Sequence, residues 1–269
     1  MTTPVSGWQS HHDNDNNNMW ENYGASPSVH PSDGDVIEQH DDTTGSSHFL
    51  IYGNRPTYRS TGMDSGPCVE YDGSSDHLSF YTTGAASTKH RLDEVIAADE
   101  YTVLMAVQIT ADGSDGTAAK IYDENALIAN TNQYWGIHVT TSAGTTTITH
   151  YAYDSTDTPP ERECSVTLPA QNQTVVIQAR KTNSNIYISI DGGTEDSETI
   201  SGDISGGLSG EVVVGESGDL DYQAFKLGEM YIYQSDLGAS NNTYTHLREE
   251  WLGESPGGSI LPLLNHYGS

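Results

Sequence analysis

The feature that most constrains the fold is a series of short segments in which apolar and polar residues alternate. Residues 101–110 place Tyr, Val, Met, Val and Ile on one side and a mixed set of side chains on the other. A period of two is the pattern of a β-strand. Similar segments follow one another with Gly, Asn and Asp between them. This arrangement predicts an all-β antiparallel sandwich or barrel rather than βαβ units.

Two hairpins are predicted from the turn residues that join neighbouring segments. Residues 133–141 and 145–153 flank a Thr-Ser-Ala-Gly turn, and residues 173–181 and 185–191 flank a Thr-Asn-Ser turn. Strands separated by such short polar loops pair as antiparallel neighbours. Residues 211–217 and 228–234 are expected to supply two more strands.

One helix is expected near the C-terminus, within residues 236–253. Ser240 or Asn241 is the candidate cap, and Gly253 is the expected end. The apolar stripe consists of Tyr244, Leu247 and Trp251. Without an evident linker, we expect one domain over residues 1–254 and a tail over 255–269, whose apolar residues 260–264 tuck into the domain or dock on a partner.

The charge balance is strongly acidic, with 38 Asp and Glu against 10 Lys and Arg and a formal net charge of −28. Such a surface repels itself in dilute buffer and is screened in concentrated salt. The balance predicts a protein from an extreme halophile, the alternative being a very soluble acidic extracellular protein. It also argues against nucleic acid and anionic membranes as partners, because no basic patch is present.

The sequence shows neither an 18-residue apolar run nor a leader-like N-terminus, so membrane insertion and a cleaved signal are not expected. We therefore expect a chain that stays in the cytoplasm or leaves its cell by another route, for example inside a virion. Cys68 and Cys164 are too few for a disulfide framework. Buried free thiols are expected, with a single disulfide as the alternative.

The stretch GPCVEYDGSSDHLSF, residues 66–80, has two interpretations. Its acidic residues and His77 could form a site for a metal or for acid/base chemistry. Alternatively, Val69 and Tyr71 face a core while Glu70 and Asp72 face water, and a turn at Asp72 leads into a second strand. The alternation favours the second interpretation, a hairpin-like element.

Three segments in this order resemble a known group: RPTYRSTGMDSGPCVEYDGSSDHLSF, then VVIQARKTNSNIYISIDGG, then the end of the chain from VVVGESGDLDY to REEWLG. They resemble the concanavalin A-like, laminin G-like jelly rolls frequent in structural proteins of phages and archaeal viruses. The matching positions are 55–58, 66–76 and 228–253, and the resemblance spans residues 8–253. It departs from the group's pattern around residues 20–24, where a Trp-Asp-Ser-Gly sequence is only partly present.

This resemblance implies an all-β, two-sheet antiparallel jelly-roll sandwich with one C-terminal helix. With the acidic surface, it implies a non-catalytic virion surface protein of a virus with a halophilic host: a capsid decoration, turret or fibre. Its expected partners are other virion proteins, and copies of itself in a homo-oligomer.

A carbohydrate-binding adhesin for host surface glycans is the first alternative function. Sugar sites use aromatic rings, and tyrosines outnumber phenylalanines 16 to 3. The expected aromatic face, which could equally serve packing, consists of Tyr134, His138, Tyr151, Tyr153, Tyr187, Tyr231 and Tyr233.

A glycan-cleaving enzyme is the second alternative. Glycosidases need two facing carboxylates. The nearest candidates lie in residues 92–100, an apparent turn before a strand, and in residues 215–222, an apparent loop, so neither places alternating carboxylates within a strand. The carboxylates to test are Asp93, Glu94, Asp219 and Asp221. No Gly-x-Ser-x-Gly or His-Glu-x-x-His motif is present. We therefore expect no catalysis.

No cofactor is required by any motif, but the resemblance implies that a calcium ion can sit at the rim of a sheet. Carboxylate and carbonyl oxygens are the ligands that calcium prefers. The candidate ligands are Asp76, Asp123, Asp219 and Asp221. His11 and His12, beside a run of Asp and Asn, could bind a cation weakly, although a polar N-terminal loop is expected there.

The charge gives a first testable prediction. Lowering the salt concentration from molar to about 0.05 M lengthens the distance over which the carboxylates repel one another. We expect the protein to lose structure, or its assembly to dissociate, across this range. Circular-dichroism melts at both concentrations measure the effect, and identical melting curves would contradict the assignment to a halophile.

Overall fold

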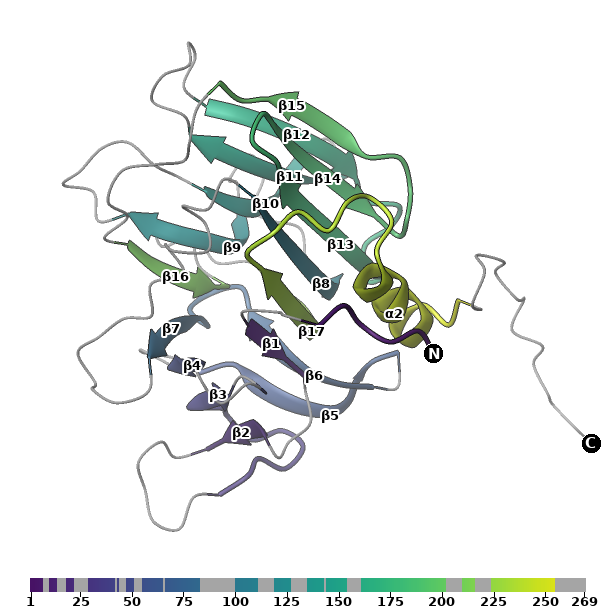
Figure 1. Ribbon diagram of the computed structural model, residues 1–269. Coiled ribbons are helices and arrows are strands. Elements are labelled where there is room, and N and C mark those ends of the chain that lie inside the picture. The colour runs from purple at the N-terminus through teal and green to yellow at the C-terminus, as the bar shows by residue number, and fades with distance from the viewer. Residues whose placement is uncertain are drawn as a thin grey trace, which may run out of the picture.

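The computed structural model describes residues 1–6, 10–13, 18–21, 29–41, 43, 47–50, 55–64, 66–82, 100–110, 119–126, 135–142, 144–153, 161–201, 210–215 and 224–254. Within these residues the chain forms two antiparallel sheets and one helix, as Figure 1 shows. The predicted fold class, a two-sheet antiparallel sandwich of the jelly-roll kind with a C-terminal helix, is confirmed.

Sheet A has eight strands in the order β15-β14-β13-β8-β17-β6-β5, with β1 also paired to β17. Its strands are β1 (Ser10–His12), β5 (Thr57–Met63), β6 (Gly66–Asp72), β8 (Tyr101–Ile109), β13 (Thr174–Lys181), β14 (Asn185–Ile190), β15 (Asp196–Thr199) and β17 (Ala224–Tyr233).

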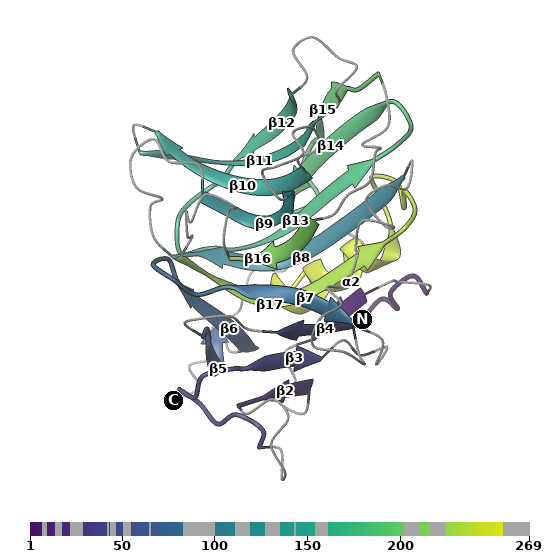
Figure 2. The ribbon, with the colours of Figure 1, turned by 90° about the vertical axis from the view of Figure 1, so that its left-hand side faces the viewer.

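Sheet B has nine strands in the order β12-β11-β10-β9-β16-β7-β4-β3-β2. Its strands are β2 (Met19–Trp20), β3 (Gln39–Asp41), β4 (Ser47–Leu50), β7 (Leu78–Thr82), β9 (Ala119–Ala126), β10 (Trp135–Ser142), β11 (Thr145–Tyr153), β12 (Glu161–Thr167) and β16 (Gly210–Val214). In Figure 2 the two sheets lie face to face.

Both predicted hairpins are present. β10 pairs with β11 from Trp135 opposite Ala152 to Ser142 opposite Thr145. β13 pairs with β14 from Ile177 opposite Ile190 to Lys181 opposite Ile186. The remaining predicted strands correspond to β8, β16 and β17.

The stretch 66–80 is not a hairpin, which corrects the sequence-based expectation. β6 pairs with β5 and β17 in sheet A, whereas β7 pairs with β4 and β16 in sheet B. The turn between them therefore carries the chain from one sheet to the other. Val69 and Tyr71 do face the core, as predicted. Local alternation specifies which side chains are buried, but the partner of each strand is a distant segment that alternation cannot identify.

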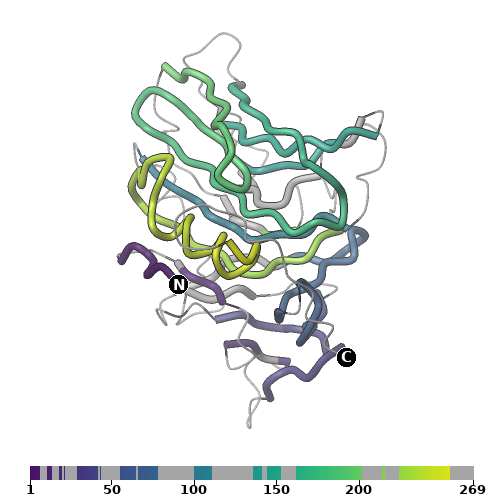
Figure 3. Tube along the Cα trace, turned by 90° about the vertical axis from the view of Figure 1, so that its right-hand side faces the viewer, coloured from purple at the N-terminus to yellow at the C-terminus, as the bar shows by residue number. Residues whose placement is uncertain are grey.

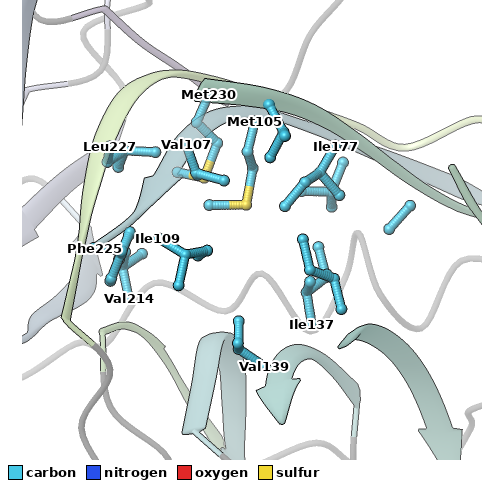
Figure 4. Close-up of a cluster of buried hydrophobic side chains, with 14 of the residues drawn as sticks. Met105, Val107, Ile109, Ile137, Val139, Ile177, Val214, Phe225, Leu227 and Met230 are labelled. Atoms are coloured by element: carbon cyan, nitrogen blue, oxygen red, sulfur yellow. The ribbon is translucent and has the colours of Figure 1, made fainter. Parts of the chain in front are cut away.

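The main core lies between the sheets. Figure 4 shows Met105, Val107 and Ile109 of β8 pointing toward Ile137 and Val139 of β10. Cys164 belongs to this core, while Cys68 lies in a second cluster on the other side of sheet A. Both cysteines are free and buried, as expected.

The second cluster is formed by helix α2 (Asn242–Trp251), which covers the outer face of sheet A. Tyr244, Leu247 and Trp251 form its apolar stripe, and Asn241 is its N-cap, with Oδ1 accepting from the Tyr244 N–H at 2.8 Å. Gly253, with φ of +66°, follows the helix. The helix prediction is confirmed with its cap, stripe and end. It is too short to span a membrane, and no described helix meets that requirement.

A buried histidine links the two sheets through the main core. His150 of β11 is fully buried. Its Nδ1 donates to the backbone carbonyl of Tyr187 in β14 at 2.9 Å. Its Nε2 lies 2.8 Å from the Tyr101 hydroxyl in β8 and accepts from it. Burial lowers the pKa of His150 to about 4. The hydrogen bond to the Tyr187 carbonyl opposes this shift, and the charges of His138 and Lys181 add to it.

The depressed pKa of His150 predicts a pH dependence of stability. The unfolded chain binds a proton near pH 6.5 and the folded chain only near pH 4, so stability should fall between these values. The expected loss is about 3 kcal/mol at full protonation. Urea unfolding of the wild type and of His150→Gln at pH 7 and pH 4, in molar salt, isolates this contribution. An identical pH dependence in both proteins would contradict it.

Candidate functional site

The acidic turn after β6 is held together by its own carboxylates. Asp72 accepts hydrogen bonds from the backbone N–H groups of Ser74, Ser75 and Asp76 at 2.8–3.2 Å. Burial alone would raise the pKa of Asp72, but the bonds from Ser74, Ser75 and Asp76 outweigh it and lower the pKa to about 2. The Asp76 carboxylate in turn accepts from the Asp72 N–H at 3.0 Å.

The other polar residues of this stretch also have local partners. Glu70 forms an ion pair with Arg59 at 2.6 Å, and His77 Nδ1 lies 3.3 Å from the Ser75 carbonyl. Asp76 is buried, and burial raises its pKa. The turn therefore gives these acids a structural role. Of the other candidate calcium ligands, Asp123 lies on β9 opposite Gly136, but only its backbone is described. Asp219 and Asp221 lie outside the described residues.

The predicted aromatic residues do not share one face. Tyr231 and Tyr233 lie beneath α2, 2% and 1% exposed. The Tyr233 hydroxyl donates to the Val5 carbonyl at 2.8 Å. The expectation of an open face is thus wrong for these two residues, because α2 and the N-terminal segment cover them. Figure 3 shows this segment running beside α2.

Tyr187 lies on the same side of sheet A but beside a charged group. The Arg180 guanidinium stacks 3.7 Å from the centre of its ring, and Arg180 also pairs with Glu195 at 2.6 Å and Asp236 at 3.1 Å. Tyr134 lies outside the described residues, and Tyr153 is described only by its backbone, at the end of β11 opposite Glu161. The candidate carboxylates for cleavage, Asp93, Glu94, Asp219 and Asp221, are also outside.

Besides Tyr231 and Tyr233, whose rings stack beneath α2, the structure brings together the predicted residues His138 and Tyr151. The rings of His138 and Tyr151 stack with centroids 5.1 Å apart. Both alternate with core residues such as Ile137 and Ile148, so they occupy the outer face of sheet B. In Figure 1 sheet B and α2 lie on opposite sides of the molecule.

Around this pair, three strands present a regular array that we call the polar grid. Its rows, each running across β10, β11 and β12, are Thr140–Thr147–Thr167, His138–Thr149–Ser165 and Gly136–Tyr151–Glu163. Thr167, Ser165 and Glu163 are exposed, and His138, Thr140 and Thr147 are half-buried, whereas Gly136, Thr149 and Tyr151 are buried. The accessible part of the grid offers hydroxyl, imidazole and carboxylate groups, and the grid contains no aliphatic side chain larger than threonine.

A second polar cluster lies on the opposite side of the molecule, between β17 and α2. The β17 register shifts between Leu227 and Met230, and this bulge turns Glu229 toward the helix. Gly228 permits the close approach, since a Cβ there would lie 2.8 Å from the Trp251 ring. Trp251 Nε1 donates to Glu229 Oε2 at 3.4 Å.

Glu229 is buried, as are its donors Tyr231 and Trp251, whereas its donor His11 is half-buried. Glu229 Oε1 accepts from His11 Nε2 and from the Tyr231 hydroxyl, each at 2.7 Å. Burial alone would raise the pKa of Glu229, but the bonds from His11 and Tyr231 outweigh it and lower the pKa. His246 Nε2 and Glu250 Oε2, 3.2 Å apart, complete the cluster.

Sequence reasoning missed this cluster. It placed His11 and His12 in a polar loop, whereas they form β1 and pair with Tyr231 and Met230. The available signals were the His-His pair and the four-residue spacing of His246 and Glu250, which puts both on one side of a helix. The position of Glu229 depends on a bulge that the alternation does not reveal.

Comparison with known proteins gives structural neighbours but no sequence family. No family model and no curated protein matches the chain. Domain 4 of AbnA, a GH43 extracellular arabinanase from Geobacillus stearothermophilus in complex with arabinotriose, is 14% identical with a TM-score of 0.57. The match covers 90% of this chain and 98% of that domain.

Two other matches extend over only part of the matched chain. The receptor binding domain of botulinum neurotoxin mosaic serotype C/D is 12% identical, with a TM-score of 0.56, over 89% of this chain and 51% of that one. The Trypanosoma rangeli sialidase is 9% identical, with a TM-score of 0.58, over 94% of this chain and 34% of that one. The chain thus spans about half the length of the botulinum neurotoxin domains it matches. At such identities these likenesses show the fold alone: a β-sandwich of the jelly-roll type.

The acidic turn gives a prediction for stability. Asp72→Ala removes the acceptor of three backbone N–H groups and should lower the free energy of unfolding by about 1–2 kcal/mol. Asp72→Asn is the matched control, because its amide oxygen keeps one acceptor, and it should cost less. Denaturant unfolding in molar salt, with calcium and with chelator, measures both. A loss that appeared only when calcium was present would indicate an ion site instead of a turn.

Proposed function

We propose that this protein is a non-catalytic module that binds glycans through the outer face of sheet B. The observation that carries the proposal is the polar grid around the stacked pair of His138 and Tyr151. Sugars present many hydroxyl groups, and they bind where donors and acceptors are closely spaced and fixed.

The geometry of the grid suits such a ligand. Neighbouring strands are about 4.8 Å apart, and side chains on one face repeat about every 7 Å along a strand, which is the scale of one or two sugar rings. Threonine hydroxyls both donate and accept, and the branched side chain has few rotamers, so little freedom is lost on binding. The Glu163 carboxylate and the His138 imidazole lie on the two outer strands of the array, where they can form stronger hydrogen bonds than the hydroxyl groups when they are charged.

The structural neighbours support the same proposal. The arabinanase domain that matches nearly end to end was solved with arabinotriose, and the matched toxin domain is described as receptor binding. In each case the function belongs to the neighbour, and here it adds weight to a ligand-binding role for the shared sandwich.

The location that we propose is the surface of a virion in a high-salt environment, with host surface glycans as ligands and further virion proteins as neighbours. Support comes from the order of the three sequence segments and from the net charge of −28. Retention of the protein on particles stripped of surface proteins, compared with retention on intact host cells, separates decoration of the virion from recognition of the host.

A glycan array in molar salt, followed by calorimetry on the glycans retained, tests the proposal. We expect His138→Ala and Glu163→Gln to weaken binding at least about tenfold, equivalent to about 1.4 kcal/mol. Ser197→Ala, at an exposed position of β15 in sheet A, is the control and should bind like the wild type. The proposal fails if no glycan is retained or if the grid variants bind normally. Cleavage of a retained glycan would refute the non-catalytic assignment.

A further inference from the structure

The cluster between β17 and α2 has the geometry of a metal-binding site. Glu229, His246 and Glu250 each offer one ligand atom, and these atoms all lie within 4.8 Å of one another. His246 and Glu250 are one helical turn apart, with Nε2 and Oε2 separated by 3.2 Å. In a tetrahedral zinc site with bonds of about 2.0–2.1 Å, neighbouring ligand atoms are about 3.4 Å apart.

Hydrogen bonds from outside the cluster orient two of these ligands. His246 Nδ1 lies 3.0 Å from the Thr2 carbonyl, which can only accept, so Nδ1 carries a proton and Nε2 faces the carboxylates. A ring nitrogen that donates to a backbone carbonyl is the arrangement typical of metal-bound histidines. The Glu229 carboxylate is also held in one orientation, because its Oε1 accepts hydrogen bonds from both His11 and Tyr231.

Charge and access also favour a cation. The carboxylates of Glu229 and Glu250 converge on His246, and His11 occupies Oε1 of Glu229 as a hydrogen-bond donor. Arg248, the basic residue in the last turn of α2, is paired with Glu254. The side chain of Glu229 is 8% exposed, whereas that of Glu250 is 40% exposed. The cluster therefore opens to solvent on one side, where an ion can enter and where water can complete its coordination.

We propose that Glu229, His246 and Glu250 bind one divalent transition-metal cation of the zinc type. An imidazole nitrogen with two carboxylate oxygens is a set that zinc accepts, with a water as the fourth ligand. Calcium prefers six to eight oxygen ligands and is a poorer match to three protein ligands that include a nitrogen.

Such an ion would cross-link three segments that are distant in the sequence. Glu229 belongs to β17, His246 and Glu250 belong to α2, and the hydrogen bonds to Thr2 and His11 bring in the N-terminal segment. A ligand that binds only the folded chain stabilises it. The expected role is therefore structural: the ion fixes α2 and the N-terminus over sheet A.

Zinc titration calorimetry tests the proposal on the full chain, after treatment with chelator, without a histidine tag and in molar salt. Excess calcium and magnesium in the buffer suppress diffuse binding to the acidic surface. We expect one zinc per chain and a higher melting temperature with zinc. His246→Gln and Glu250→Gln should each weaken binding by at least about tenfold, a loss of the size seen when metal sites are perturbed.

The matched controls are His77→Gln and Glu163→Gln, which lie away from the cluster and should bind zinc like the wild type. Because Glu250 is partly exposed, its variant should fold even if a Glu229 variant does not. Anomalous diffraction at the zinc edge should place the ion between β17 and α2. Unchanged affinity in both cluster variants, complete displacement by calcium, or an ion found elsewhere would each overturn the proposal.

Discussion

The burial of sheet A on both of its faces is the constraint on which the rest of the structure depends. β13 is buried at every position and β8 at all but one. One side of these strands packs against sheet B, and the other side packs against α2. A sheet with two apolar faces requires a cover on each. The C-terminal helix and the N-terminal segment that packs beside it are therefore integral parts of the domain.

Polar groups inside this body are fixed by hydrogen bonds between segments. His150 joins sheet B to two strands of sheet A through the core. Glu229 joins β17 to β1. Buried polar groups are costly unless they are paired, so each pairing favours one arrangement of the segments that it links. Among the described residues, carboxylates thus have two roles: some, such as Asp33 and Glu163, are exposed to the solvent, and others, such as Asp76 and Glu229, are buried and hold the fold together.

The two outer faces of the sandwich differ in what they can do. The outer face of sheet A is occupied by α2, and its polar groups converge on the cluster around Glu229, which suits an ion that locks the helix in place. The outer face of sheet B carries the polar grid, which is formed by a meander of adjacent strands with hydroxyl groups in register. The proposed binding role thus rests on a sandwich in which a helix covers one outer face and a polar array lies on the other.

The sequence by itself determined the all-β class, the two hairpins, the buried sides of the strands, and the helix with its cap at Asn241 and its end at Gly253. All of these depend on residues close together in the chain, so their periodicity and their turn residues can be read directly from the sequence. Tertiary structure decided what depends on distant partners. It placed β6 and β7 in different sheets, buried Tyr231 and Tyr233 beneath α2, and joined His138 to Tyr151. It also brought His11, Glu229 and His246 together, because strand pairing and a bulge, rather than local spacing, set their positions.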